Sequence, residues 1–145
     1  MNKAEMTQQQ KHVAFKTAFD TFNGYLQQQN LIGAYVVAFS ILEDRMAVAF
    51  MLLRDLQKQE RPSASKFIPL GDKIKELTKN GHIEQTDGHL YLACARDRNS
   101  KLHAAMWNLN EFSSDDCHRV IKLARKADKV GRELKKLLPK NKNAI

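Results

Sequence analysis

Arg98, Asn99 and His103 are the side chains of this 145-residue chain whose types and spacing best fit a functional site. Asn99 and His103 are four residues apart, so on a helix they share a face and can hydrogen-bond to each other. Arg98 lies beside Asn99 and is long enough to reach the same pocket. Because buried polar groups cost free energy unless they are hydrogen-bonded, three of them within an apolar stripe need a structural or a functional explanation.

The helix that must position these side chains is predicted at about residues 89–109. A polar segment at 81–88 precedes it, and its final Asp87 and Gly88 predict a turn. We expect the apolar stripe that includes Asn99 to face the core, and Trp107 to belong to the core rather than to serve as a base-stacking platform. The stripe consists of Leu92, Ala95, Leu102, Met106 and Leu109.

Apolar residues at helical spacing predict four further helices. They span about residues 8–29 and 31–60, a short stretch that begins near Leu70 and is stopped by Asn80-Gly81, and a last one that begins after Ser113 or Ser114 and ends before Pro139. No segment shows the alternation of a strand. The sequence therefore predicts a single all-α domain over residues 1–145, an up-and-down bundle of about five helices, with loose ends at 1–8 and 139–145.

The predicted helix at 31–60 has apolar residues along two faces. Such a helix is either central to a bundle or covered by a second subunit. Glu43 lies within one of its apolar stripes and Arg45 within the other. Because an unpaired buried charge is too costly, we expect both to be paired or functional.

Charge and composition favour a polyanionic partner, nucleic acid first. The chain has 24 Lys and Arg against 16 Asp and Glu, which gives a net charge of +8. Basic residues follow the predicted last helix, and with Lys101 they supply the candidate RNA-binding residues. This set is Lys101, Lys122, Arg125 and Lys129.

Other classes of function find less support in the sequence. Cys94 and Cys117 make no disulfide framework, and with the histidines they lack zinc-finger spacing. No Gly-rich phosphate loop is present, so we expect neither a metal nor a cofactor. The longest apolar run is interrupted by charges at 43–45, and the N-terminus lacks a signal-peptide pattern, so we expect a cytoplasmic protein without a membrane span.

The pattern Arg98-Asn99-x-x-x-His103 resembles the signature of HEPN domains, which are small helical bundles with this signature on a late helix. Residues 40–45, in a long apolar helix, resemble the corresponding early helix, and the likeness covers roughly residues 30–135. It implies a metal-independent endoribonuclease in which the RNA 2′-hydroxyl is the nucleophile.

In that resemblance each residue of the signature has an implied role. His103 is the general base or acid, Arg98 holds the phosphate, and Asn99 orients His103 or contacts the phosphate. Supporting roles fall to other charged residues nearby. The resemblance further implies a homodimer with both signature helices at one cleft, and a role in toxicity, defence or host takeover, with an antitoxin protein as a partner. The supporting residues are Glu43, Asp44 and Arg96.

Two non-catalytic interpretations stand beside this one. The first is a structural bundle in which His103 is a hydrogen-bonded histidine at the core edge and Arg98 and Arg96 form ion pairs with Glu43, Asp44 or Asp97. The second is a helical module that binds nucleic acid or protein without cleaving it, resembling the mannitol operon repressor family. An accessible cleft around the trio favours the enzyme, and burial favours the structural bundle.

Overall fold

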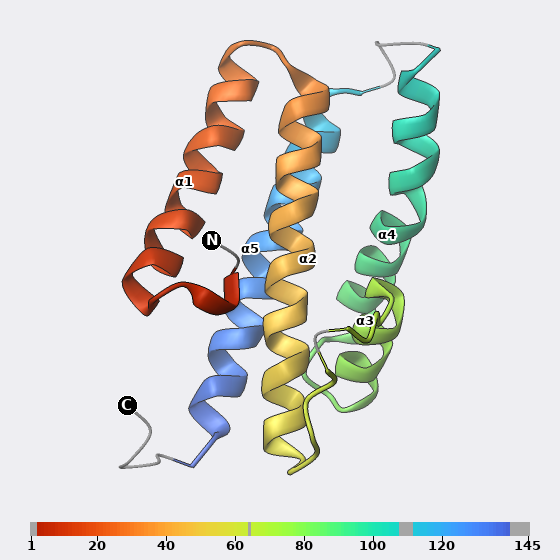
Figure 1. Ribbon diagram of the computed structural model, residues 1–145. Helices are drawn as coiled ribbons and strands as arrows, with labels where there is room; N and C mark the ends of the chain where they lie inside the picture. Colours follow the sequence, from red (N-terminus) through yellow and green to blue (C-terminus); the bar gives the residue numbers. More distant parts are fainter. Residues whose placement is uncertain (1–2, 64, 108–111, 140–145) are drawn as a thin grey trace.

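The protein is an all-α helical bundle, as predicted (Figure 1). The computed structural model describes residues 3–63, 65–107 and 112–139. Within these ranges there is no strand. None of the helices described is both long and apolar enough to span a membrane. After a 3₁₀ turn at Lys3–Glu5 come α1 (Gln8–Gln27), α2 (Leu31–Leu56), α3 (Leu70–Lys79), α4 (Gln85–Ala105) and α5 (Ser114–Leu137).

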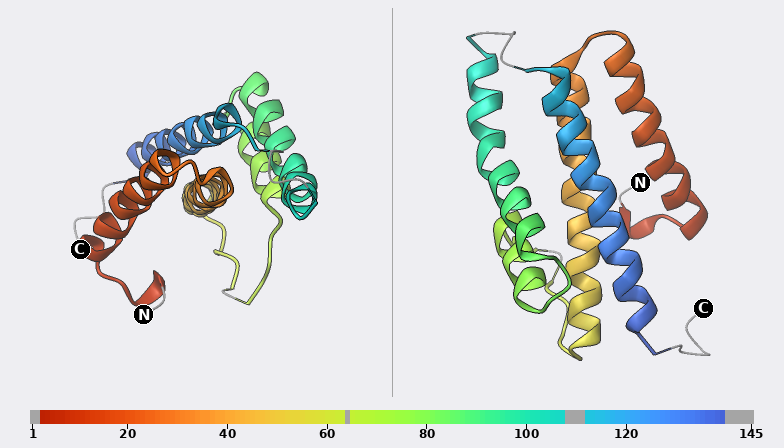
Figure 2. Two further views of the ribbon diagram at one scale, coloured as in Figure 1. Left: turned by 90° about the horizontal axis from the view of Figure 1, so that it is seen from above. Right: turned by 180° about the vertical axis from the view of Figure 1, so that it is seen from behind.

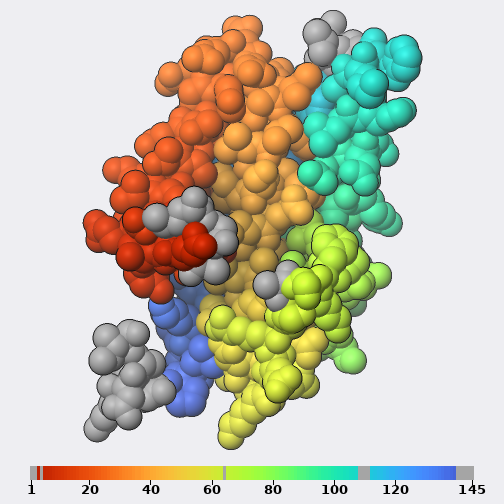
Figure 3. Space-filling view, viewed as in Figure 1, coloured from red at the N-terminus to blue at the C-terminus, as the bar shows by residue number. Residues whose placement is uncertain are grey.

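Helix α2 lies at the centre, because it is apolar on more than one face and each face needs a cover. It packs along most of its length against α5, and it also packs against α1 and α3 (Figures 1 and 2). Leu42, Met46 and Ala49 are fully buried between these neighbours. Seen from the front, α2 has α1 on one side and α3 and α4 on the other (Figure 3). Of the two explanations for its two apolar faces, the central position in the bundle is therefore the one observed.

Helix α5 is amphipathic and turns its apolar side to α2. The predicted apolar face is buried at four of its six positions, Val130 is half-buried and Leu137 is exposed. Gly131 brings the two helices close, since a Cβ there would lie 3.9 Å from Val48 Cγ1. The buried positions are Val120, Leu123, Ala127 and Leu134.

Capping residues set several of the boundaries. The Asn30 side chain accepts a hydrogen bond from the Gly33 amide at 2.9 Å, and Ser113 caps α5 as the sequence predicts. Helices α1 and α2 end at Gln27 and Leu56, a few residues before the predicted 29 and 60. Helix ends are the least predictable part of a helix, because the last turn frays into turn geometry.

The loose segment expected at 1–8 stays a prediction, and the structure gives residues 3–8 defined contacts. Thr7 forms a capping box with Gln10 at the start of α1, and Lys3 pairs with Asp44 of α2. These bonds satisfy backbone groups that would otherwise need water. Of the predicted loose tail, residues 140–145 lie outside the described residues.

The predicted turn at Asp87 and Gly88 is wrong, since both lie in the first turn of α4, which begins at Gln85. Gly88 is buried against α3, where a Cβ would lie 2.8 Å from Thr78 Oγ1. The glycine therefore serves close packing of α3 on α4 rather than a change of chain direction.

We expect Gly88→Ala to destabilise the protein, although alanine is the better helix former. The Thr78 hydroxyl that its Cβ would meet is fixed by a 2.7 Å hydrogen bond to the Ile74 carbonyl. Overpacking of this kind costs about 1–3 kcal/mol in the free energy of unfolding, which urea denaturation measures.

The matched control is Gly24→Ala in α1, because a Cβ at Gly24 meets nothing within 4 Å. This change should leave stability unchanged or raise it by about 0.5–1 kcal/mol. Equal tolerance of the two substitutions would contradict the inferred packing of Gly88 on Thr78.

Candidate functional site

Helix α4 presents Asn99 and His103 on an open face. Both residues are exposed, and their spacing of one helical turn keeps their side chains neighbours. The expectation that they lie in a buried stripe, with His103 at the core edge, is therefore wrong for the single chain. The side of α4 that is buried carries other residues, namely Gly88, Tyr91, Cys94 and Ala105.

The apolar stripe around Asn99 is only partly covered. Leu92, Ala95 and Leu102 are half-buried, whereas Met106 is 74 % exposed and Leu109 lies outside the described residues. Trp107, which the sequence places in the core, is instead 81 % exposed. Periodicity correctly identifies an apolar face here, but α2 already has α1, α3 and α5 against it, so this face of α4 is left toward solvent.

Arg98 points away from His103, toward α2. Its guanidinium carbon lies 4.8 Å from the Phe39 ring centroid, and its Nη2 lies 3.9 Å from Glu43 Oε1. Five residues on a helix turn through about 140° beyond a full circle, which explains why Arg98 and His103 face different ways. The Arg98 and Glu43 side chains are 40 % and 46 % exposed, so solvent keeps the strength of this pair low. Phe39 and Glu43 thus fix the direction of Arg98 more than they stabilise the fold.

The other predicted supporting residues do not join the trio. The Asp44 carboxylate accepts hydrogen bonds from Lys3 and Arg45 instead. Burial by itself would raise the Asp44 pKa, but these hydrogen bonds outweigh burial and lower it. Arg96 is exposed on the outer side of α4. Asp44 belongs to an ion cluster on the α1 side of α2. Its partner Arg45 also has Nη1 3.5 Å from Asp128 Oδ1 and its guanidinium carbon 4.5 Å from the Phe15 ring centroid.

Three of the four predicted RNA-binding residues share the outer face of α5. Lys122, Arg125 and Lys129 are exposed there, and the Arg125 guanidinium lies 4.5 Å from the Phe19 ring of α1. Seen from behind, α5 lies between α4 and α1, so this face is open (Figure 2). Lys101 is set apart, because it is 24 % exposed and its Nζ lies 3.2 Å from Asp116 Oδ2.

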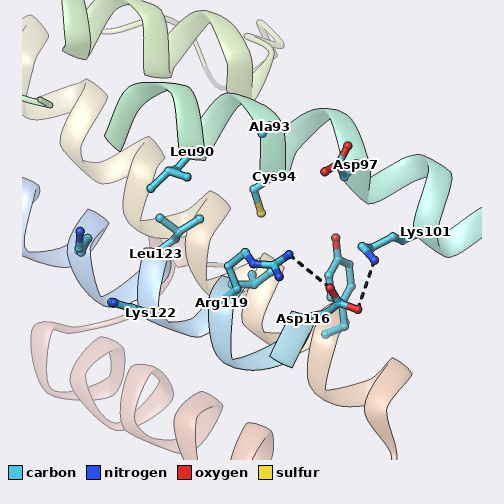
Figure 4. Close-up of a pocket in the computed structure, with 12 residues that line it drawn as sticks. Leu90, Ala93, Cys94, Asp97, Lys101, Asp116, Arg119, Lys122 and Leu123 are labelled. Carbon is cyan, nitrogen blue, oxygen red and sulfur yellow. Dashed lines mark hydrogen bonds and ion pairs between the residues drawn. The ribbon is translucent and has the colours of Figure 1, made fainter. Parts of the chain in front are cut away.

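The sequence did not predict a cavity of about 430 Å³ between α4 and α5 (Figure 4). One stripe of α4 lines it, on the side opposite Asn99 and His103, and Tyr35 of α2 also lines it. The residues of that stripe follow Leu90 by three, four, seven and eleven positions, which is helical spacing and could have indicated a shared face. The stripe mixes apolar and charged residues, so a search for apolar periodicity does not find it. From α4 the lining residues are Leu90, Ala93, Cys94, Asp97 and Lys101.

Asp116 organises one end of this cavity. Its carboxylate accepts a hydrogen bond from the Ser113 amide at 3.1 Å, and it binds Lys101 of α4 and, at 3.4 Å, Arg119 (Figure 4). Burial acts to raise the Asp116 pKa, but the hydrogen bonds from Ser113 and Lys101 outweigh it and lower the pKa. Asp116 therefore completes the capping box of α5 and at the same time ties α4 to it.

The two cysteines are both free thiols, and both are buried. Burial raises the pKa of Cys94 and of Cys117 to about 11, so both are protonated at neutral pH. Cys117 donates to the Leu31 carbonyl at 3.3 Å, while Cys94 lines the cavity. Among the residues the structure describes, no group of three His, Cys, Asp or Glu side chains is arranged to hold a metal ion.

Comparisons of the chain with protein-family models, with curated proteins and with solved structures found no match. The function is therefore inferred from the side chains that α4 and α5 present. These form an open face with Asn99 and His103, a basic face on α5, and the cavity between the two helices.

We expect Asp116→Asn to lower the free energy of unfolding by about 1–3 kcal/mol at neutral pH, because the charge-assisted bonds to Lys101 and Arg119 are lost. A carboxyl whose folded pKa is lowered stabilises the fold above its unfolded pKa, and this contribution disappears as pH falls through the folded pKa. The difference between wild type and variant should therefore shrink in urea titrations taken from pH 7 to below the usual carboxyl range.

Asp115→Asn is the control, since Asp115 is the exposed neighbour in the same first turn. It should change stability by less than Asp116→Asn. If the difference in the free energy of unfolding between wild type and Asp116→Asn stays constant over the whole acid titration, the charge of Asp116 does not hold α4 to α5.

Proposed function

We propose that this protein is a metal-independent endoribonuclease of the HEPN type, with its site on the outer face of α4. The observation that carries the proposal is the exposure of His103 and Asn99, one helical turn apart, on that face. Burial of the pair, which would have favoured the structural bundle, is not observed. An exposed pair of imidazole and amide on a rigid helix is free to contact a substrate.

The chemistry assigned to the site is attack of an RNA 2′-hydroxyl on the adjacent phosphate. His103 takes the hydroxyl proton or returns one to the leaving 5′-oxygen, since imidazole can do either near neutral pH. Asn99 orients the imidazole or donates to a phosphate oxygen. Arg98, held by Phe39 and Glu43 but 40 % exposed, offers its remaining donors to the developing negative charge. The products are a cyclic phosphate and a free 5′-hydroxyl.

A second copy of the chain completes the site in this proposal. Arg98 and His103 face different ways on one helix, so two copies of α4 side by side would supply both groups to one cleft. Support comes from the partly covered stripe of Leu92, Ala95 and Leu102, which continues into the exposed Met106 and Trp107. Contiguous exposed apolar side chains of this kind mark contact surfaces.

The outer face of α5 is proposed to attract the RNA. Lys122, Arg125 and Lys129 are exposed along it, and a net charge of +8 favours a polyanion over the whole surface. A cytoplasmic toxin, defence or host-takeover role, with an antitoxin protein that covers α4, follows from the resemblance and belongs to this proposal.

We expect purified wild-type protein to cleave RNA in EDTA and to leave cyclic phosphate ends, and His103→Ala to lose at least about a hundredfold in rate, the usual worth of a general acid or base. The measurement is gel and mass analysis of the products. His89→Ala is the matched control, because His89 is also exposed on α4, nearly four turns earlier.

Equal cleavage by the His103→Ala and wild-type proteins would remove His103 from the mechanism. If neither cuts RNA, while both fold alike and bind RNA with the same affinity, the non-catalytic binding module replaces the enzyme. The contacts of Arg98 with Phe39 and Glu43 suit the structural bundle, because they use the guanidinium to place α4.

We expect Trp107→Glu to weaken self-association about tenfold or more, since buried tryptophans dominate the interfaces that contain them. Sedimentation equilibrium measures the dissociation constant. Phe67→Glu is the control, because Phe67 is an equally exposed aromatic residue, at 85 %, that lies outside α4. A wild-type protein that stays monomeric at every concentration would contradict the two-subunit site.

A further inference from the structure

The cavity between α4 and α5 has the size of a small-molecule site. It encloses about 430 Å³, within the range of about 300–1,000 Å³ that ligand pockets occupy. It exists because α4 packs closely on α3, whereas in the described ranges its backbone does not pack closely against that of α5. The cavity lies on the side of α4 opposite Asn99 and His103, so it is separate from the proposed ribonuclease site.

The inner wall of the cavity is apolar. Tyr35, Cys94, Val120 and Leu123 line it and are buried from solvent. The Cys94 side chain points from α4 toward α5 across the space (Figure 4). Leu90, at 48 % exposure, is a large apolar side chain left partly open. A flat or slim apolar group that filled this space would cover Leu90 and displace water from apolar walls.

The charged lining favours an anion. Four cations and two carboxylates line the cavity, and the acids are Asp97 and Asp116. Asp116 is already bound by Lys101 and Arg119, and Lys126 Nζ lies 3.1 Å from Asp87 outside the lining. In the part of the chain that the structure describes, neither Lys122 nor Asp97 forms an ion pair, and the four cations against two carboxylates leave the lining a net charge of +2. The exposed lysine beside an apolar wall is the feature that a small acid would recognise.

We propose that this cavity binds a small organic anion with an apolar body. The body lies against Val120, Leu123 and Cys94, and the carboxylate, phosphate or sulfonate lies at Lys122 on the rim. The bound molecule bridges α4 and α5 where these helices lack direct packing. None of the lining residues belongs to the trio, so the proposal does not depend on RNA cleavage, although Lys122 also lies on the face of α5 that is proposed to attract RNA.

The test compares two fluorescent probes that differ only in charge. 8-Anilinonaphthalene-1-sulfonate carries a sulfonate, and N-phenyl-1-naphthylamine is the same body without it. We expect the sulfonate probe to bind wild type more tightly than the neutral one, and Lys122→Glu to weaken the sulfonate probe about fivefold, the scale of one exposed charge contact, while the neutral probe is unaffected. Lys129→Glu is the matched control on the same helix, outside the lining.

Two further measurements locate the probe. Ala93→Phe should fill the cavity and weaken both probes at least about tenfold with the helical circular dichroism spectrum unchanged, because Ala93 lines the space. In single-cysteine variants, the sulfonate probe should slow iodoacetamide modification of Cys94 at pH 9 but not that of Cys117. Cys117 is the internal control, since burial raises its pKa to about 11 as well but it does not line the cavity.

The proposal is overturned if the neutral probe binds as tightly as the sulfonate, or if Lys122→Glu and Lys129→Glu have equal effects. It is overturned too if the sulfonate probe leaves the modification rate of Cys94 unchanged, which would place the probe on another apolar surface such as Trp107. The Lys122 and cysteine measurements decide the matter even where Ala93→Phe disturbs the fold.

Discussion

The burial of α2 is the constraint on which the rest of the structure depends. Fully burying one large aliphatic side chain is worth about 1.5–3 kcal/mol, and α2 buries ten residues along its length, most of them large. Helices α5, α1 and α3 provide that burial by packing around it. Once these three are in place, α4 packs mainly on α3, at the edge of the bundle (Figure 1). The features from which function is inferred all follow from this peripheral position of α4.

Polar contacts add to the apolar packing that holds α4 against α2 and α5, where Tyr91 and Cys94 belong to the buried core. The Tyr91 hydroxyl donates to the Leu123 carbonyl at 3.2 Å, and Lys101 reaches Asp116 across the cavity. Arg98 adds the contact with Phe39 on the α2 side. Hydrogen bonds and ion pairs of this kind are directional but contribute little net stability at partly exposed positions. Together with the burial of Tyr91 on the core side, they favour the rotation of α4 in which Asn99 and His103 face outward.

The sequence predicted the helices well, because the information for them is local. Asn30 and Ser113 cap the helices that the apolar spacing predicts, and α2 is correctly marked as central by its two apolar faces. The sequence predicted α4 poorly, because periodicity identifies an apolar face without saying what covers it. Periodicity assigned the stripe through Leu102 and Met106 to the core, whereas the buried side of α4 carries Tyr91 and Ala105. The turn predicted at Gly88 was wrong for the same reason, since the role of this glycine depends on its packing against Thr78 of another helix.

The candidate site was predicted as residues but not as an arrangement. Spacing alone places Asn99 with His103, and the structure keeps them together on one face. Spacing alone does not reveal that Arg98 contacts Phe39 and so points away from His103, because the Phe39 ring lies almost sixty residues earlier in the chain. Under the proposed ribonuclease mechanism, His103 and Arg98 diverge on one helix, so the site would need another surface to bring the two groups together. The exposed Met106 and Trp107 at the end of α4 are the reason why we propose a second copy of α4 for that surface.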